Sequence, residues 1–374
     1  MSFGYLDEFM KRMPKRGVPA CELTVLKDGE QVYRTAVGYA DGEGKRAAAV
    51  GDLYWIFSTT KVVTCVAAMR LLEEGKISLE DPVSRYLPAF ADVRVRGANG
   101  AYAVPQGSMN LLHLFTMTGG MAYDIGSASI RSSEDRSTLG LVSAMAKDPL
   151  CFEPGEHYRY SLCHDVLGAV VEVASGMPFS EYLQKTIFDP LEMKDIGFRP
   201  TREQRARMSA LYLQEGAASS PKLVPTENIY ALSDEYESGG AGLFSSVDDY
   251  AKLLSALSLG GTAKNGYRLL KPETVAMMGE NRLSEKARND FVTTRLYGYG
   301  WGLCGRAHMD PLVSLSPTGV GEFGWDGAAG AFALADPKNH VAMFFGSHVR
   351  GVQYLYHKVH FKLVDLAYQA MGLA

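Results

Sequence analysis

The chain has 374 residues, of which 47% are hydrophobic and 21% are charged. This composition is typical of a globular protein and argues against disordered, collagen-like and coiled-coil classes. Lys and Arg number 38 against 42 Asp and Glu, a formal net charge of −4, so no basic excess favours nucleic acid or an anionic membrane surface as a partner.

The five cysteines form no Cys-x-x-Cys pair, which favours free thiols in a reducing compartment over a disulfide framework. The first residues lack the apolar segment of a secretory signal. No apolar run approaches the roughly 20 residues that cross a bilayer. The sequence therefore predicts a cytoplasmic protein with no membrane or nucleic-acid partner, and it leaves the oligomeric state open.

The first elements in chain order are a hairpin and a buried helix. Residues 21–38 alternate apolar and polar around an Asp-Gly turn, which predicts two antiparallel strands. Residues 58–74 have almost no polar face, so we expect a helix in the middle of a core, ended by Gly75. Residues 76–240 are predicted to be mostly helical, with helices over 165–174 and 180–188.

The last third returns to strands after one more helix. A helix is expected over 247–259 with Ser246 as its N-cap, then strands over 297–303, 329–335 and 340–347 and a closing helix over 352–371. Strands at both ends predict one antiparallel sheet built from both termini and flanked by helices, with an all-helical domain inserted. We expect residues 1–57 and 241–374 to form the sheet domain and 58–240 the helical one, with an active site at their seam.

The sharpest motif is Ser58-Thr59-Thr60-Lys61, a Ser-x-x-Lys pair at the start of the buried helix. Residues three apart share one helix face, and a desolvated lysine loses part of its preference for the ammonium form, so it can serve as a base. The plain alternative is an N-cap and a surface charge, but burying a lysine without a purpose is costly. A second match at 219–222 lies in a Gly-, Ala-, Ser- and Pro-rich stretch that no helix would align.

Four further segments, together with this motif, resemble one known group of proteins. They are PGEHYRYS (154–161), FDPLEMKDIGF (188–198), GGAGLFSSVDDYAKLL (239–254) and FGWDGAAGAFALADPKN (323–339). In this order they are similar to the serine β-lactamase and penicillin-binding-protein superfamily, in its class C-like branch, with family VIII carboxylesterases the most similar. The resemblance covers residues 17–349 and implies the β-lactamase/transpeptidase-like fold.

The resemblance also implies a set of catalytic residues. Ser58 matches the acylated nucleophile, Lys61 its partner base, and Tyr160 the motif tyrosine that passes a proton to the leaving group. These assignments come from the family pattern rather than from spacing alone.

The third motif of the family corresponds to Trp325-Asp326-Gly327, which we expect on an edge strand that lines the site. By the same resemblance, the backbone N–H groups of Ser58 and Ala328 would form the oxyanion hole. Gly327 fits a close approach of backbone to substrate.

Two departures from the family pattern bear on the substrate. Leu162 stands where β-lactamases and transpeptidases have an asparagine that binds the acylamino group, and leucine makes no such hydrogen bond. Asp326 stands inside a motif that otherwise helps hold a substrate carboxylate, which it would repel. A third departure, Met117-Thr118-Gly119-Gly120 in place of His-Thr-Ser-Gly, has no functional interpretation.

The sequence thus predicts a serine hydrolase that cleaves small or medium acyl esters through an acyl-enzyme on Ser58, with no cofactor and no metal. The alternatives are β-lactamase or D-amino-acid peptidase or amidase activity in the same site, acyl transfer to an alcohol, and a non-catalytic binding protein of the same fold. His357 and His360 are interpreted as a surface pair rather than a zinc site.

Overall fold

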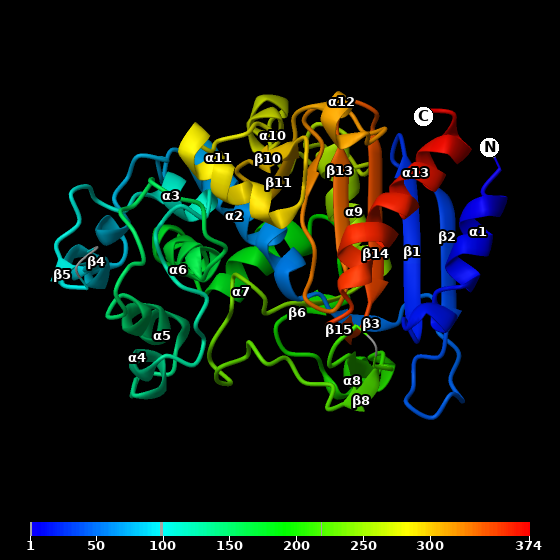
Figure 1. Cartoon of the computed structure of the whole chain (residues 1–374), viewed down its shortest axis with the longest axis horizontal. Helices are drawn as coiled ribbons and strands as arrows, with labels where there is room; N and C mark the ends of the chain where they lie inside the picture. Colours follow the sequence, from blue (N-terminus) through cyan, green and yellow to red (C-terminus); the bar gives the residue numbers. More distant parts are fainter. Residues whose placement is uncertain (1, 98–99, 218) are drawn as a thin grey trace.

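The computed structural model describes residues 2–97, 100–217 and 219–374. Its centre is a seven-stranded antiparallel sheet in the order β10-β11-β12-β13-β14-β1-β2, which confirms a sheet built from both termini (Figure 1). The predicted hairpin is present, and its turn residues Asp28 and Gly29 have φ values of 54° and 78°, as a two-residue hairpin requires. The strands are β1 (Ala20–Lys27), β2 (Glu30–Gly38), β10 (Tyr299–Trp301), β11 (Arg306–His308), β12 (Phe323–Gly324), β13 (Phe332–Asp336) and β14 (Val341–Ser347).

Helices cover both faces of this sheet. On one face, α1 (Gly4–Lys11) and α13 (His360–Met371) share a buried cluster with β1 and β14. On the other face lies α9 (Val247–Ser258), whose Tyr250 ring stacks on Phe344 of β14 with centroids 4.2 Å apart. Ser246 caps α9 as predicted, because its side chain accepts a hydrogen bond from the Asp249 N–H.

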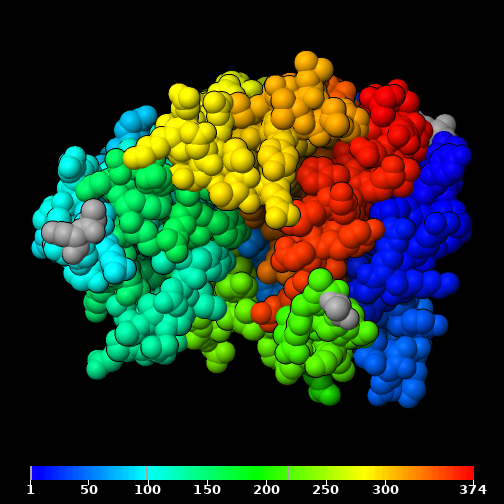
Figure 2. Space-filling model, viewed as in Figure 1, coloured from blue at the N-terminus to red at the C-terminus, as the bar shows by residue number. Residues whose placement is uncertain are grey.

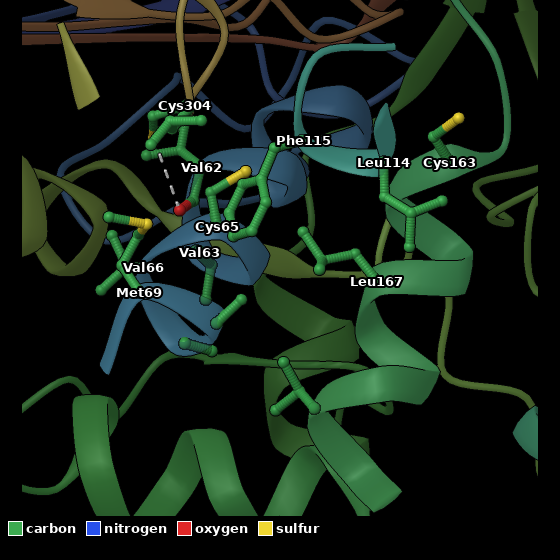
Figure 3. Packing of buried hydrophobic residues seen from close by; sticks show 14 of the residues in the cluster. Val62, Val63, Cys65, Val66, Met69, Leu114, Phe115, Cys163, Leu167 and Cys304 are labelled. Carbon is green, nitrogen blue, oxygen red and sulfur yellow. Dashed lines mark hydrogen bonds between the residues drawn. The ribbon is translucent and has the colours of Figure 1, made fainter. Parts of the chain in front are cut away.

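Most of the remaining helices gather beside one edge of the sheet, around α2 (Thr60–Glu73) (Figure 1). Figure 3 shows valine, cysteine and methionine side chains of α2 packed against Phe115, Leu114 and Leu167. The helix is buried on nearly all sides, as its lack of a polar face predicts. The other helices are α3 (Leu111–Phe115), α4 (Ala128–Arg131), α5 (Thr138–Met145), α6 (Cys163–Ser175), α7 (Phe179–Leu183), α8 (Arg202–Arg207), α10 (Pro272–Met278), α11 (Glu285–Phe291) and α12 (Pro311–Ser314).

Short strands form three further small sheets. These sheets are β3-β9-β6, β15-β7-β8 and β4-β5. Lys222, the lysine of the second Ser-x-x-Lys match, begins β8 and pairs with Glu215 at 3.2 Å, so no helix aligns that motif. The bounds are β3 (Leu53–Trp55), β4 (Val95–Arg96), β5 (Tyr102–Ala103), β6 (Ile196–Gly197), β7 (Leu211–Leu213), β8 (Lys222–Val224), β9 (Phe244–Ser246) and β15 (Val349–Arg350).

Three predicted elements differ in their bounds. The strand expected over 297–303 is limited to β10, and the one over 329–335 begins only at Phe332, because residues 327–331 form a tight turn with the Gly327 N–H bonded to the Ala331 carbonyl. The closing helix begins with a π-helical turn over Leu355–Val359 before α13. Within the described ranges, no helix combines the length and the apolar character that crossing a membrane requires.

Candidate active site

Ser58 lies in a short 3-10 turn, Phe57–Thr59, that leads directly into α2. Phe57 is buried and has a φ of 44°, a left-handed conformation that is strained for a non-glycine residue. The turn places Ser58 just before the N-terminus of α2. One turn later, Lys61 is 1% exposed, and its Nζ donates to Ser58 Oγ at 3.3 Å and to the Gly240 carbonyl at 2.7 Å. The predicted serine–lysine pair is therefore in contact.

Burial sets the protonation of Lys61. Desolvation lowers the pKa of Lys61 to about 8, although the nearby carboxylate of Asp165 opposes this shift. Asp165 is itself held by the hydroxyls of Tyr236 at 2.7 Å and Ser238 at 2.5 Å. A lysine in this environment has a substantial neutral fraction near neutral pH and is suited to accept a proton.

Tyr160 lies against the same pair. Its ring stacks on Trp325 and on Tyr123, each with centroids 5.5 Å apart, and Lys61 Nζ lies 4.6 Å from its ring centroid. The Trp325 Nε1–H donates to the Tyr160 hydroxyl oxygen at 2.9 Å. Burial raises the pKa of Tyr160, so the phenol stays protonated and can act as a proton donor.

The third motif reaches Ser58 from the sheet, but from a different strand position than expected. It follows β12, which lies between β11 and β13 and is not an edge strand. A Cβ on Gly327 would come within 2.4 Å of the Ile56 carbonyl, so glycine is needed here for close approach to the chain before Ser58. Within the described residues the Ala328 N–H donates no hydrogen bond, and Ser58 lies in the first turn of its helix, where N–H groups lack intrahelical partners. Both N–H groups are thus available as oxyanion donors.

Asp326 is less exposed to a ligand than the sequence suggests. Its Oδ1 lies 3.8 Å from Arg306 Nη1 and 3.4 Å from His360 Nδ1, and its side chain is 19% exposed. Arg306 also bonds Glu322 at 2.9 Å. Because the positive charge of Arg306 partly offsets the negative charge of Asp326, Asp326 repels a substrate carboxylate less strongly than an unpaired aspartate would.

These groups open into one cavity of about 470 Å³. Figure 2 shows a hollow at the centre of this face, where the green, yellow and red segments meet. The cavity wall is predominantly aromatic and contains no lysine or arginine side chain among the described residues. It is lined by Ser58, Tyr123, Tyr158, Tyr160, Tyr230, Thr294, Leu296, Trp325, Asp326, Gly327, Ala328, Gln353, Tyr356 and His357.

Two sequence expectations differ from this arrangement. Leu162 does not line the cavity; it is buried in the core at the start of α6 and borders a separate hollow with Met121 and Met145. His357 and His360 are not a surface pair, because His357 lines the cavity and His360 is buried with its Nε2 donating to the Gly330 carbonyl at 3.0 Å.

Several cavity residues were missed by sequence reasoning. Tyr123, Tyr230 and Tyr356 come from three distant segments, and no local pattern marks them among the 20 tyrosines of the chain. The one usable signal is that Tyr123 closely follows the departure at Met117–Gly120, which had no interpretation.

The model of the family described as Beta-lactamase matches residues 5–354. The chain belongs to the β-lactamase family. It is 31% identical over 352 residues to "Esterase EstB" of Burkholderia gladioli, covering 86% of this chain and 84% of that protein. It is 28% identical over 371 residues to a "Putative D-alanyl-D-alanine carboxypeptidase" of Escherichia coli K12, covering 90% and 80%.

A solved structure supports the fold of this β-lactamase-family protein. "EstCE1, a hydrolase with promiscuous acyltransferase activity" superposes with a TM-score of 0.81 at 24% identity and covers 97% of each chain. The fold is β-lactamase/transpeptidase-like, as the resemblance implied. Together with the family match and the esterase relative, this makes the protein a serine hydrolase.

Proposed function

We propose that this β-lactamase-family protein hydrolyses small and medium acyl esters through an acyl-enzyme on Ser58. The observation that carries the proposal is the contact between Ser58 and a fully buried Lys61 at 3.3 Å, at the foot of an aromatic cavity that also holds Tyr160. The name of the esterase relative agrees with this assignment. The substrate is a small-molecule ester, since the cavity holds about 470 Å³.

Acylation begins with loss of the Ser58 proton. Neutral Lys61 takes this proton as Ser58 Oγ attacks the ester carbonyl, and the N–H groups of Ser58 and Ala328 hold the resulting oxyanion. Tyr160 then gives its proton to the leaving alkoxide and regains one from Lys61, so the net transfer is from Ser58 to the alcohol.

Deacylation runs the same transfers in reverse. Water attacks the acyl carbonyl and gives its proton to Tyr160, which passes its own proton to Lys61. The tetrahedral intermediate collapses with Ser58 Oγ as leaving group, and the proton returns to Ser58. Each group is thereby restored for the next cycle.

The first experiment compares wild type with Ser58→Ala in hydrolysis of p-nitrophenyl acetate and butyrate. We expect Ser58→Ala to lose at least about a thousandfold in kcat/KM, because nucleophilic catalysis is removed. Ser219→Ala, at the second Ser-x-x-Lys match, is the control and should retain wild-type rates. Full esterase activity in Ser58→Ala would exclude the proposal.

Amide chemistry is the second candidate, favoured by the putative carboxypeptidase relative. The cavity wall argues against it, since no lysine or arginine among its described residues faces a substrate carboxylate. Nitrocefin turnover as efficient as that of a simple aryl ester would reverse this ranking.

Acyl transfer to an alcohol is a close variant, supported by the promiscuous acyltransferase activity of the similar hydrolase EstCE1. An alcohol would replace water in deacylation without any change of catalytic residues. Added methanol or butanol should reveal it as a transesterified product in gas chromatography.

A further inference from the structure

Tyr123 occupies a place at Ser58 that the proposed mechanism leaves unused. It lines the same cavity as Ser58, and its ring lies nearly parallel to that of Tyr160, at 7° with centroids 5.5 Å apart. Lys61 Nζ lies 5.5 Å from the Tyr123 ring centroid. Two tyrosine rings therefore lie close to Lys61, which contacts Ser58.

The segment Met117–Gly120 holds Tyr123 in this place. Met117 is buried and has a φ of 58°, and Gly120 has a φ of 80°, where a Cβ would come within 2.5 Å of the Phe152 carbonyl. The Gly120 carbonyl accepts from Cys151 N–H at 2.7 Å, and the Met117 carbonyl accepts from Arg159 N–H at 3.0 Å. These two hydrogen bonds link the turn to residues 151–159, which directly precede Tyr160. The same contacts therefore position both tyrosines.

The two phenols differ in their hydrogen bonding. Burial raises the pKa of both. Tyr160 also accepts from the Trp325 indole, which stabilises negative charge on its oxygen. Within the described chain the Tyr123 hydroxyl makes no hydrogen bond, so its proton remains available for donation.

We propose that Tyr123 is a second catalytic phenol, which donates a hydrogen bond to Ser58 Oγ as that oxygen leaves the acyl group. Negative charge develops on Ser58 Oγ in deacylation, and a fixed donor there lowers the barrier. The proton itself still returns to Ser58 from Lys61, and Tyr123 stays neutral throughout. This inference rests on the proposed acyl-enzyme at Ser58 and assigns separate tasks to the two tyrosines.

The test isolates deacylation in Tyr123→Phe, which keeps the ring and its stacking. The enzyme is acylated with p-nitrophenyl butyrate, freed of substrate by rapid desalting, and followed by intact-protein mass spectrometry. We expect the acyl-enzyme of Tyr123→Phe to decay about 10- to 100-fold more slowly than that of wild type. Because kcat/KM reports acylation, it should change by less than about threefold.

Tyr267→Phe is the matched control. Tyr267 does not line the cavity, and its hydroxyl donates to the Thr186 carbonyl at 2.9 Å. Its acyl-enzyme should decay at the wild-type rate. Equal decay in wild type and Tyr123→Phe would overturn the inference, and so would equal losses in acylation and deacylation, which indicate a packing role.

A second pair of variants separates the loss of the hydrogen-bond donor from the loss of ring packing. Tyr123→Gln carries a donor without the ring, and Tyr123→Leu carries neither, so deacylation should be faster in the glutamine variant. Deacylation no faster in Tyr123→Gln would contradict a donor role. Absence of any Ser58-dependent acyl-enzyme in wild type would instead refute the proposed function itself, which separates the two failures.

Discussion

At the scale of single residues, the site depends on how burial changes ionisation. Lys61 is buried and Tyr160 is half-buried, and desolvation favours the neutral form of each, which suits the lysine to act as base and the tyrosine as acid. The sequence could predict Ser58, Lys61 and Tyr160 because each lies in a segment that resembles a motif of the family. It could not predict Tyr123 or Tyr356, since their place at the cavity depends on the tertiary path of separate loops.

The pKa of Lys61 gives a pH dependence with a definite sign. The base must be neutral, and its pKa is about 8, so kcat/KM should rise with pH and level off above this value. Below it, the rate should fall about tenfold per pH unit. Initial rates with p-nitrophenyl acetate, corrected for spontaneous hydrolysis, measure the profile. A flat profile between about pH 6 and pH 9 would contradict Lys61 as the base.

Trp325→Phe tests the hydrogen bond to Tyr160 while keeping an aromatic ring. Loss of the Nε1 donor should reduce kcat/KM for p-nitrophenyl esters about 10- to 100-fold, with a smaller change in the thermal midpoint. Trp55→Phe is the control, because the Trp55 Nε1–H donates to the Thr226 carbonyl at 3.4 Å and Trp55 does not line the cavity. Equal activities of the two variants would show that the indole N–H has no catalytic effect.

At the scale of elements, the site is the meeting point of a strained turn and a close-packed strand end. Phe57 holds its left-handed φ where the turn enters α2, and Gly327 packs against the carbonyl of Ile56. The sequence predicted the helix and the hairpin well because their periodicity is local. It placed the third motif on an edge strand wrongly, because the strand order results from long-range pairing.

Gly327→Ala tests this close approach. The added Cβ must displace the chain before Ser58, so we expect kcat/KM to fall more than about 100-fold, since a shift near 1 Å at a reacting group has this effect. Gly107→Ala, where a Cβ would meet no atom within 4 Å, is the control and should keep wild-type activity. Wild-type kinetics in Gly327→Ala would contradict the spacing that the structure shows.

At the scale of the whole molecule, strands from both ends of the chain build the sheet that supports the third motif. β1 lies between β14 and β2, and the two termini lie near each other (Figure 1). The division into a sheet domain of residues 1–57 and 241–374 and a helical domain of 58–240 stays a prediction. The family pattern established the fold more securely than periodicity, because five motifs in order constrain long-range topology and local patterns do not.

Leu23→Ala separates stability from chemistry. Leu23 is fully buried in the cluster between β1, α1 and α13, away from the cavity. Its truncation should lower the free energy of unfolding by about 2–5 kcal/mol. Urea denaturation followed by circular dichroism measures this, and kcat/KM at 25 °C should match wild type. Leu312→Ala, at a residue 87% exposed, should change neither quantity. A loss of kcat/KM in folded Leu23→Ala would show that the sheet core controls the site directly.

The central claim is that Ser58 is acylated by esters in preference to β-lactams. Intact-protein mass spectrometry with peptide mapping tests it most directly, after wild type and Ser58→Ala are mixed separately with a p-nitrophenyl ester and with a penicillin. The account predicts an ester adduct on the peptide that carries Ser58, absent from Ser58→Ala, and little reaction with penicillin. Rapid penicillin acylation, or an ester adduct that persists in Ser58→Ala, would contradict it.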